Sequence, residues 1–420
     1  MLDSILLDEI SSSESSALAK PPAPLDSFAL AVTSQRDTAE DAKSASAPPL
    51  CALFEINSTS KSVALDAFVR PKMTMEQRRE LYLPAEWHKQ QMVQLTWPHE
   101  NTDWAYMLDE AVKCFVDIAV AISRRQRLLI VTPEPECVRK QLQMTAANIQ
   151  NIRFFQCESN DTWARDHAFI TILGDSIPHY LDFEFNGWGR KFAADKDNAI
   201  NSKMYDAGVV KGEYEDCLSL VLEGGSIESD GKGTLLTTTH CLMAPHRNQP
   251  LTREQIEKRL VQMLHVKRVL WLDHGNLIGD DTDGHIDTIA RFAPGDTIIH
   301  VRCDDPEDEQ FADLQAMEAQ LATFRTEDDK PYRLLALPSP DAIFDENNER
   351  LPATYANFLI MNNAVLYPTY AQPQNDQRAA EVLAKAFPTH EIIGIDCRAL
   401  IKQHGSLHCV TMQYPIIERH

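Results

Sequence analysis

Four short polar segments carry the residue types from which catalytic and binding sites are built. They are "NDTWARDH" at 160–167, "LEGGSIESDG" at 222–231, "DHGNLIGDDTDGHIDTIARF" at 273–292 and "GSLHCVTMQYP" at 405–415. The third crowds two histidines and four aspartates between His274 and Asp287, and then runs into an apolar pattern. The fourth places Cys409 ahead of an apolar pattern typical of a strand. A nucleophilic thiol, a histidine and several carboxylates are thus available to one site.

Each segment also has a simpler interpretation. Asp166 could have no role beyond an ion pair with its neighbour Arg165, and Glu223 could be a solvated carboxylate in a hairpin. The 273–292 segment could be a solvated acidic loop. Cys409 could be a buried structural thiol. The Gly-Gly pair that follows Glu223 favours a site, because glycine lets the backbone approach another group closely.

Two chemistries could use this set of residues. The His-x-Asp pair of His285 and Asp287, with nearby carboxylates, offers ligand types for zinc or manganese, but the sequence has no HxH, HExxH or Cys–His quartet. The other chemistry is covalent catalysis by a thiol, with His285 moving protons. In that case the carboxylates have a second task, since a planar guanidinium presents N–H donors that carboxylates bind bidentately.

Composition narrows the classes of partner. The chain has 420 residues, of which 44% are hydrophobic and 24% charged, and 40 Lys and Arg face 62 Asp and Glu, for a net charge of −22. This charge argues against a nucleic-acid or anionic-membrane partner and suits a cationic substrate. No apolar run approaches the roughly 20 residues that span a bilayer. The nine cysteines are scattered and form no CxxC pair, which together with the absence of a secretory signal pattern predicts free thiols in the cytoplasm.

The chain divides near residue 75. Residues 11–75 are rich in Ser, Ala, Pro and Asp, and residues 1–75 are predicted to be a largely disordered extension, apart from the short apolar stretches "CALFEI" and "SVALDAFV". Residues 76–420 are predicted to form a single domain. Strands are expected at 92–98, 127–133, 152–158, 168–174, 233–241, 266–273, 296–301, 332–338 and 390–396, with an apolar stretch at 357–368. Helices are expected at 104–125, 134–147, 252–265, 309–324 and 376–387. The alternation indicates an α/β or α+β domain of similar units.

The motifs together resemble the agmatine deiminase and bacterial-type peptidylarginine deiminase family. The resemblance runs from "LPAEWHKQQMVQLTWPHENTDW" through "NDTWARDHAFI", "LEGGSI" and "DDTDGHIDTIARF" to "GSLHCVTMQYP". This family belongs to the guanidino-group-modifying enzymes of the pentein fold. The resemblance implies a five-bladed α/β propeller of ββαβ units with the active site in its central channel.

The resemblance also implies roles for individual residues. It makes Cys409 the nucleophile, His285 the general acid and base, and Asp166 and Asp287 the carboxylates that clamp a guanidinium. Glu223 is similar to the acidic residue that supports the histidine. Four further residues match positions near the substrate: Trp97, Asp103, Trp163 and Asp283.

The implied function is an iminohydrolase that converts agmatine to N-carbamoylputrescine and ammonia in putrescine and polyamine biosynthesis, through a covalent thiouronium and without a metal or organic cofactor. Arginine and peptidylarginine remain alternative substrates, because Gly405, Ser406, Leu407 and Met412 depart from the pattern common in agmatine enzymes. A metal-dependent amidohydrolase and a catalytically inactive binding protein are the alternatives from other classes. The expected partner is a small cationic guanidinium compound, with no nucleic acid and no membrane, and a homodimer is the candidate assembly.

Overall fold

The computed structural model describes residues 81–174 and 176–418. The predicted disorder of residues 1–75, and the boundary near residue 75, lie outside the described residues and stay predictions. Within the described part of the chain, no helix is both long and apolar enough to cross a membrane.

Five small sheets repeat one topology. In each, an antiparallel pair of strands is followed by a connection that contains helix, and then by a strand parallel to the second. Four sheets have three strands: β4 (Ile170–Ile172), β5 (His179–Glu184) and β6 (Glu213–Val221); β7 (Ile227–Ser229), β8 (Thr234–Thr238) and β9 (Arg268–Leu272); β10 (Ala290–Ala293), β11 (Thr297–Arg302) and β12 (Arg333–Pro338); β13 (Leu359–Ile360), β14 (Ala364–Thr369) and β15 (Glu391–Asp396). The fifth has the order β16 (Thr411–Pro415), β1 (Gln90–Thr96), β2 (Arg127–Thr132) and β3 (Ile152–Gln156).

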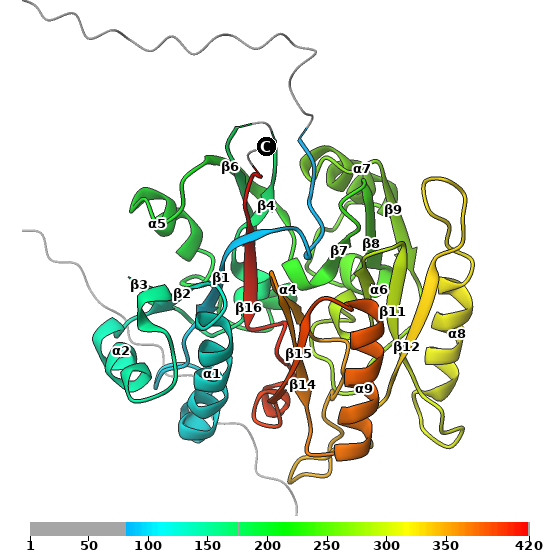
Figure 1. Cartoon of the computed structure of the whole chain (residues 1–420). Helices are drawn as coiled ribbons and strands as arrows, with labels where there is room; N and C mark the ends of the chain where they lie inside the picture. Colours follow the sequence, from blue (N-terminus) through cyan, green and yellow to red (C-terminus); the bar gives the residue numbers. More distant parts are fainter. Residues whose placement is uncertain (1–80, 175, 419–420) are drawn as a thin grey trace, which may run out of the picture. The chain divides into compact units, whose positions relative to one another are not determined.

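Helices fill the connections between the parallel strands. α1 (Leu108–Ser123) lies between β1 and β2, and α2 (Pro135–Gln143) lies between β2 and β3. α4 (Gly187–Arg190) and α5 (Ile200–Asp206) lie between β5 and β6, and α6 (Thr239–Leu242) and α7 (Arg253–Met263) lie between β8 and β9. α8 (Phe311–Leu321) lies between β11 and β12, and α9 (Pro373–Ala386) lies between β14 and β15. A further short helix, α3 (Ala164–His167), lies between β3 and β4. Figure 1 shows α1, α8 and α9 each beside the sheet of its own unit.

The strands and helices follow from local sequence. β2 is a run of apolar residues buried from Leu128 onward, as expected for a strand paired in parallel on both sides, here with β1 and β3. α1 buries Ala111, Phe115, Ile118 and Ile122, which recur at helical spacing on one face.

The last strand closes the repeat onto the first. β16 pairs antiparallel with β1, with Leu95 opposite Thr411, although more than 300 residues separate them in the chain. Cys409 lies two residues before β16, and its carbonyl accepts a 3.0 Å hydrogen bond from the backbone N–H of Arg165 in α3. The C-terminal motif is thereby held against the "WARD" segment.

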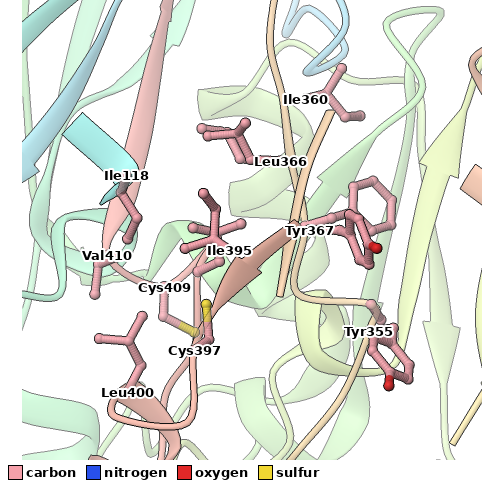
Figure 2. Close-up of a cluster of buried hydrophobic side chains, with 14 of the residues drawn as sticks. Ile118, Tyr355, Ile360, Leu366, Tyr367, Ile395, Cys397, Leu400, Cys409 and Val410 are labelled. Carbon is pink, nitrogen blue, oxygen red and sulfur yellow. The ribbon is translucent and has the colours of Figure 1, made fainter. Parts of the chain in front are cut away.

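A large hydrophobic core joins residues from several sheets. Figure 2 shows Cys409 and Val410 among the side chains of this core, with Ile118, Ile395 and Leu400 labelled nearby. The backbone around the candidate nucleophile is therefore set in a packed interior, which restricts its motion.

The sequence-based predictions are confirmed for most long elements, and wrong at several short ones. The "WARDH" segment is the short helix α3 rather than a loop, β5 to β7 were not predicted, and the stretch at 357–368 splits into β13 and β14. The cysteines other than Cys409 stand in helix or strand patterns, which predict a buried setting, but Cys137 is exposed on α2. These elements are too short or too polar for their periodicity to stand out.

Candidate functional site

Cys409 is fixed by Asn357, which precedes β13. The amide oxygen of Asn357 accepts hydrogen bonds from the backbone N–H of His408 at 2.8 Å and of Cys409 at 3.2 Å, and the Cys409 thiol donates to the same oxygen at 3.3 Å. The thiol is almost completely buried, at 4% exposure. Its position is therefore determined by a residue of the neighbouring unit.

Asp166, His285 and Asp287 converge on Gly225, from α3 and from the loop that carries the 3₁₀ turn η5 (Ile286–Thr288). A Cβ atom built on Gly225 would lie 2.6 Å from Nδ1 of His285, 2.8 Å from Oδ1 of Asp166 and 3.2 Å from Oδ2 of Asp287. Any side chain larger than that of glycine would displace these groups. This confirms the expected close approach of the Gly-Gly backbone to another group.

Asp166 is held by two donors. Its Oδ1 accepts a 3.0 Å hydrogen bond from the backbone N–H of Gly225, and its Oδ2 accepts one of 3.0 Å from Nε1 of Trp188. Trp188 has a positive φ of 54°, which is rare for a bulky residue and costs conformational energy. Nδ1 of His285 lies 3.7 Å from Oδ1 of Asp166, too far for a hydrogen bond but close enough for strong charge interaction.

Burial and charge set the ionisation of these groups. Burial raises the pKa of Asp166 to about 6, although the charge of His285 opposes this. Burial would lower the pKa of His285, but the Asp166 charge, followed by Cys241 and Glu223, outweighs it and holds the pKa well above its ordinary value. Burial, with the charges of Asp287 and Asp166, raises the pKa of Cys409 well above its ordinary value. The substrate-free site therefore holds a thiol and an imidazolium at neutral pH.

A buried network of charges lies behind Asp287. Nδ1 of His408 is 2.7 Å from Oδ2 of Asp287, and Nε2 of His408 is 2.7 Å from Oε2 of Glu86. Arg291 donates to the same oxygen of Glu86 at 2.7 Å and also pairs with Glu228. Burial disfavours the charge of Asp287, but the hydrogen bond and charge of His408 prevail and lower its pKa, so Asp287 is ionised.

A second buried pair supports Glu223. Oε1 of Glu223 accepts a 2.7 Å hydrogen bond from Nε of Arg247, while Nη1 of Arg247 donates to Oδ2 of Asp283 at 2.6 Å. Asp283 also lies 2.9 Å from Lys191 Nζ. The second carboxylate oxygen of Glu223, Oε2, is also buried, and it has no hydrogen-bond partner within the described residues.

A cavity of about 370 Å³, including its open mouth, leads to Cys409. Its lining comprises the acids Asp103, Asp161, Asp166 and Asp281, the aromatic residues Trp163, Trp188 and Phe192, and Thr282, Gln403, His404, Gly405 and Cys409. No Arg or Lys is among these lining residues of the described chain. Trp163 packs so closely on Gly405 that a Cβ there would lie 2.0 Å from its ring, which explains the glycine.

The structure brings most of the predicted site residues together, with two exceptions. Asp166, Trp163, Asp103 and Cys409 line the cavity, while His285, Asp287 and Glu223 are buried beside it. Trp97 was expected to be an aromatic wall at the substrate, but it packs on Phe115 in the core and does not line the cavity. Asp283 does not line it either and instead pairs with Arg247 and Lys191.

Sequence reasoning missed several residues that complete the site. They are Glu86, Trp188, Glu228, Cys241, Arg247, Arg291, Asn357 and His408. Glu86, Glu228, Arg291 and His408 had a signal, since each stands within a motif quoted above. Trp188, Cys241, Arg247 and Asn357 lie outside these motifs, where no pattern marks them.

Among the described residues, two buried groups could offer ligands to a metal ion. Ligand atoms of Glu223, Cys241 and His285 lie within 4.8 Å of one another, as do those of Glu86, Glu228 and His408. The acids of the second group already bind Arg291, which supplies their counter-charge. Cofactor-free covalent chemistry remains the prediction for the main reaction.

Comparison with known proteins decides the family. Residues 82–415 match the model of the Porphyromonas-type peptidyl-arginine deiminase family. The chain belongs to this family. It is 33% identical to a protein of Marinomonas sp. (strain MWYL1) provisionally named an agmatine deiminase, over 79% of this chain and 94% of the relative.

Two solved structures support the same fold. One, provisionally named an arginine deiminase from Porphyromonas gingivalis, is 52% identical with a TM-score of 0.76, covering 80% of this chain and 98% of that one. The other is a Cys-to-Ser variant of the C. jejuni agmatine deiminase with substrate bound, which is 37% identical with a TM-score of 0.75 and covers 83% and 99%. The expected pentein fold is thus confirmed, with its five ββαβ-type sheets, and the chain is a member of a family of guanidino-group-modifying hydrolases.

Proposed function

We propose that this deiminase-family protein hydrolyses agmatine to N-carbamoylputrescine and ammonia, by way of a covalent intermediate on Cys409. The observation that carries the proposal is the composition of the cavity: its lining includes the Cys409 thiol, acids and aromatic rings, and no Arg or Lys is among the lining residues of the described chain. Putrescine and polyamine biosynthesis is the pathway that such a reaction would serve, and it is part of the same proposal.

Asp166 and Asp287 hold the guanidinium. Asp166 has further acceptor capacity on both oxygens, and Oδ1 of Asp287 is buried without a hydrogen-bond partner in the described chain. A guanidinium between them satisfies these acceptors with its N–H donors and replaces their mutual repulsion by attraction. Held this way, the cation is oriented for attack on its central carbon.

The bound cation also ionises the nucleophile. Asp287 and Asp166 contribute to the raised pKa of Cys409, so neutralising their charges by a guanidinium favours the thiolate. The proton of the thiol leaves to solvent or to the site's bases. The reactive Cys409 thiolate therefore forms when the substrate is bound. In the substrate-free site the protonated thiol is less open to oxidation.

The bond changes then follow in two halves. Sγ of Cys409 attacks the guanidinium carbon and gives a tetrahedral adduct. The imidazolium of His285 donates its proton to one amino group, the C–N bond breaks, and ammonia leaves a covalent thiouronium. Neutral His285 next takes a proton from water, whose oxygen attacks the same carbon. The C–S bond breaks to release the ureido product and restore Cys409.

The tail of the substrate determines the choice among guanidinium compounds. Asp103, Asp161 and Asp281 line the cavity, and burial, followed by the charge of Asp103, raises the pKa of Asp161 to about 7. An ammonium at the end of an aliphatic chain relieves this repulsion, and the tryptophan faces suit a cation as well. Free arginine would bring an α-carboxylate into the same acidic surroundings. This favours agmatine over arginine, with peptidylarginine the remaining alternative.

A substrate screen tests the proposal. Ammonia release should be measured with agmatine, arginine and short arginyl peptides at matched concentrations, before and after exhaustive chelation. We expect agmatine to give the highest kcat/KM, with no loss of activity on chelation. Turnover of arginine or of a peptide alone would identify the substrate as that compound. Activity lost on chelation and restored by zinc or manganese would favour the metal-dependent amidohydrolase.

A further inference from the structure

Three potential metal ligands from separate segments meet behind the site. Glu223 follows β6, Cys241 lies in α6 and His285 precedes η5. One ligand atom from each lies within 4.8 Å of the others, and all three residues are 0% exposed. Oε2 of Glu223 and both ring nitrogens of His285 are buried without a hydrogen-bond partner in the described part of the chain.

The framework around these three residues is fixed. Thr238 donates a 2.6 Å hydrogen bond to the carbonyl of Gly284, immediately before His285, and accepts one of 3.2 Å from the backbone N–H of Cys241. Arg247 holds Oε1 of Glu223 and leaves Oε2 free. The short helix with Cys241 and the loop with His285 are therefore tied to each other.

We propose that Glu223, Cys241 and His285 form a regulatory zinc site. A thiolate, an imidazole and a carboxylate are the ligand types that zinc accepts in tetrahedral geometry. The ligand atoms of such a site stand about 3.3–3.7 Å apart, so the three groups need only contract slightly around the ion. The thiolate and imidazole favour zinc over the harder ions magnesium and calcium, which select oxygen ligands.

The charges of the three ligands are compatible with a bound zinc ion. Binding removes a proton from the Cys241 thiol and one from the His285 imidazolium, and the charges of Glu223 and the new thiolate then balance those of zinc. The nearby Arg247 keeps its partner Asp283. Because two protons are released, affinity should rise with pH.

The consequence for activity rests on the proposed function. Zinc bound to a ring nitrogen of His285 keeps the imidazole neutral, so the ring no longer carries the proton that it donates in the first half of the reaction, and the metal acts as an inhibitor rather than a cofactor. Removing it with a chelator restores the imidazole.

Cobalt gives a direct test of the ligands, independent of turnover. Co²⁺ substitutes for zinc in such sites, and a bound thiolate gives a near-ultraviolet charge-transfer band. The full chain should be titrated with Co²⁺ and then with competing Zn²⁺, as wild type and as Cys241→Ser, Cys241→Ala, Glu223→Gln, Cys409→Ser and Cys137→Ser. Cys137 is the exposed control thiol. Thermal unfolding of each variant reports whether it is folded.

We expect the band in wild type, Cys409→Ser and Cys137→Ser, and its loss in both Cys241 variants. Glu223→Gln should weaken zinc by more than about tenfold. In the activity assay, micromolar zinc should inhibit wild type. A band that survives in folded Cys241→Ser or Cys241→Ala, one that disappears in Cys409→Ser, or no band in wild type would each overturn the site. Because the band does not depend on substrate, these outcomes are separate from failure of the proposed function.

Discussion

Oδ2 of Asp287 and Nδ1 of His408 lie 2.7 Å apart, so the residue next to Cys409 holds one of the two candidate clamps. The same imidazole reaches Glu86 on its other side, and Arg291 neutralises that carboxylate. The segment of the candidate nucleophile and this candidate clamp are thus parts of one buried hydrogen-bonded chain. His408 is a positioning residue in this arrangement.

His408→Gln should raise KM for the guanidinium substrate more than it lowers kcat, with kcat/KM falling about 10²-fold, because Asp287 loses its fixed orientation. The matched control is His274→Gln. His274 also pairs with an aspartate, Asp313, at 3.3 Å, but both are exposed. Steady-state kinetics on agmatine check this. An effect on kcat alone, or equal effects of the two substitutions, would show that His408 does not position the clamp.

Cys409→Ser should fold normally and lose ammonia release, since a hydroxyl is far less ionised than a thiol near neutral pH. Cys137→Ser is the control and should keep wild-type turnover, because Cys137 is exposed on α2. Mass spectrometry of rapidly quenched wild type should detect the thiouronium on Cys409. Near-wild-type turnover of Cys409→Ser would remove it from the mechanism.

Alkylation should depend on the charge of the reagent. The pKa of Cys409 is raised by burial and by Asp287 and Asp166, so neutral iodoacetamide should label it slowly at neutral pH. A cationic haloacetamidine should label it much faster, since it places positive charge between the two carboxylates. Peptide mapping identifies the site, with exposed Cys137 as an internal standard. Equal rates at Cys409 for both reagents would contradict ionisation by the bound cation.

Asp166→Asn and Asp287→Asn should each reduce kcat/KM by more than about 10²-fold, because each amide removes a charge and sets N–H donors against the donors of the guanidinium. Asp328→Asn, at a residue whose side chain is 80% exposed, is the control. Kinetics and thermal unfolding should be measured together. A folded variant with only a slightly raised KM would place that carboxylate away from the substrate.

The pH dependence has a definite sign. With the pKa of Asp166 at about 6, acid protonates this clamp, so kcat/KM should rise as pH increases through that value. It should continue to rise above neutrality as the Cys409 thiol ionises, and fall when the His285 imidazolium loses its proton, since both groups have raised pKa values. A kcat/KM profile on agmatine tests this. A maximum on the acid side of pH 6 would contradict the assignment of Asp166.

Short motifs were enough to predict the chemistry. Cys409, His285, Asp166 and Asp287 stand in segments whose residue types are unusual for loops or strands, and the alternation of strands and helices indicated the α/β class. Local sequence carries this information because few residue types can serve as a nucleophile, as a base or as a carboxylate that binds a guanidinium. The sequence motif around Trp97 predicted a position near the substrate, but the fold places its ring in the core against Phe115.

Only the tertiary structure decided how the charges are compensated. Glu86 reaches His408 across 322 residues, and Asn357 reaches Cys409 across 52. A buried carboxylate is stable only with a partner, yet that partner can come from any strand or loop that the fold brings near it. The sequence by itself therefore determined which residues could react, while the closure of β16 onto β1 and the packing of five sheets determined which side chains hold them, and in which ionisation state.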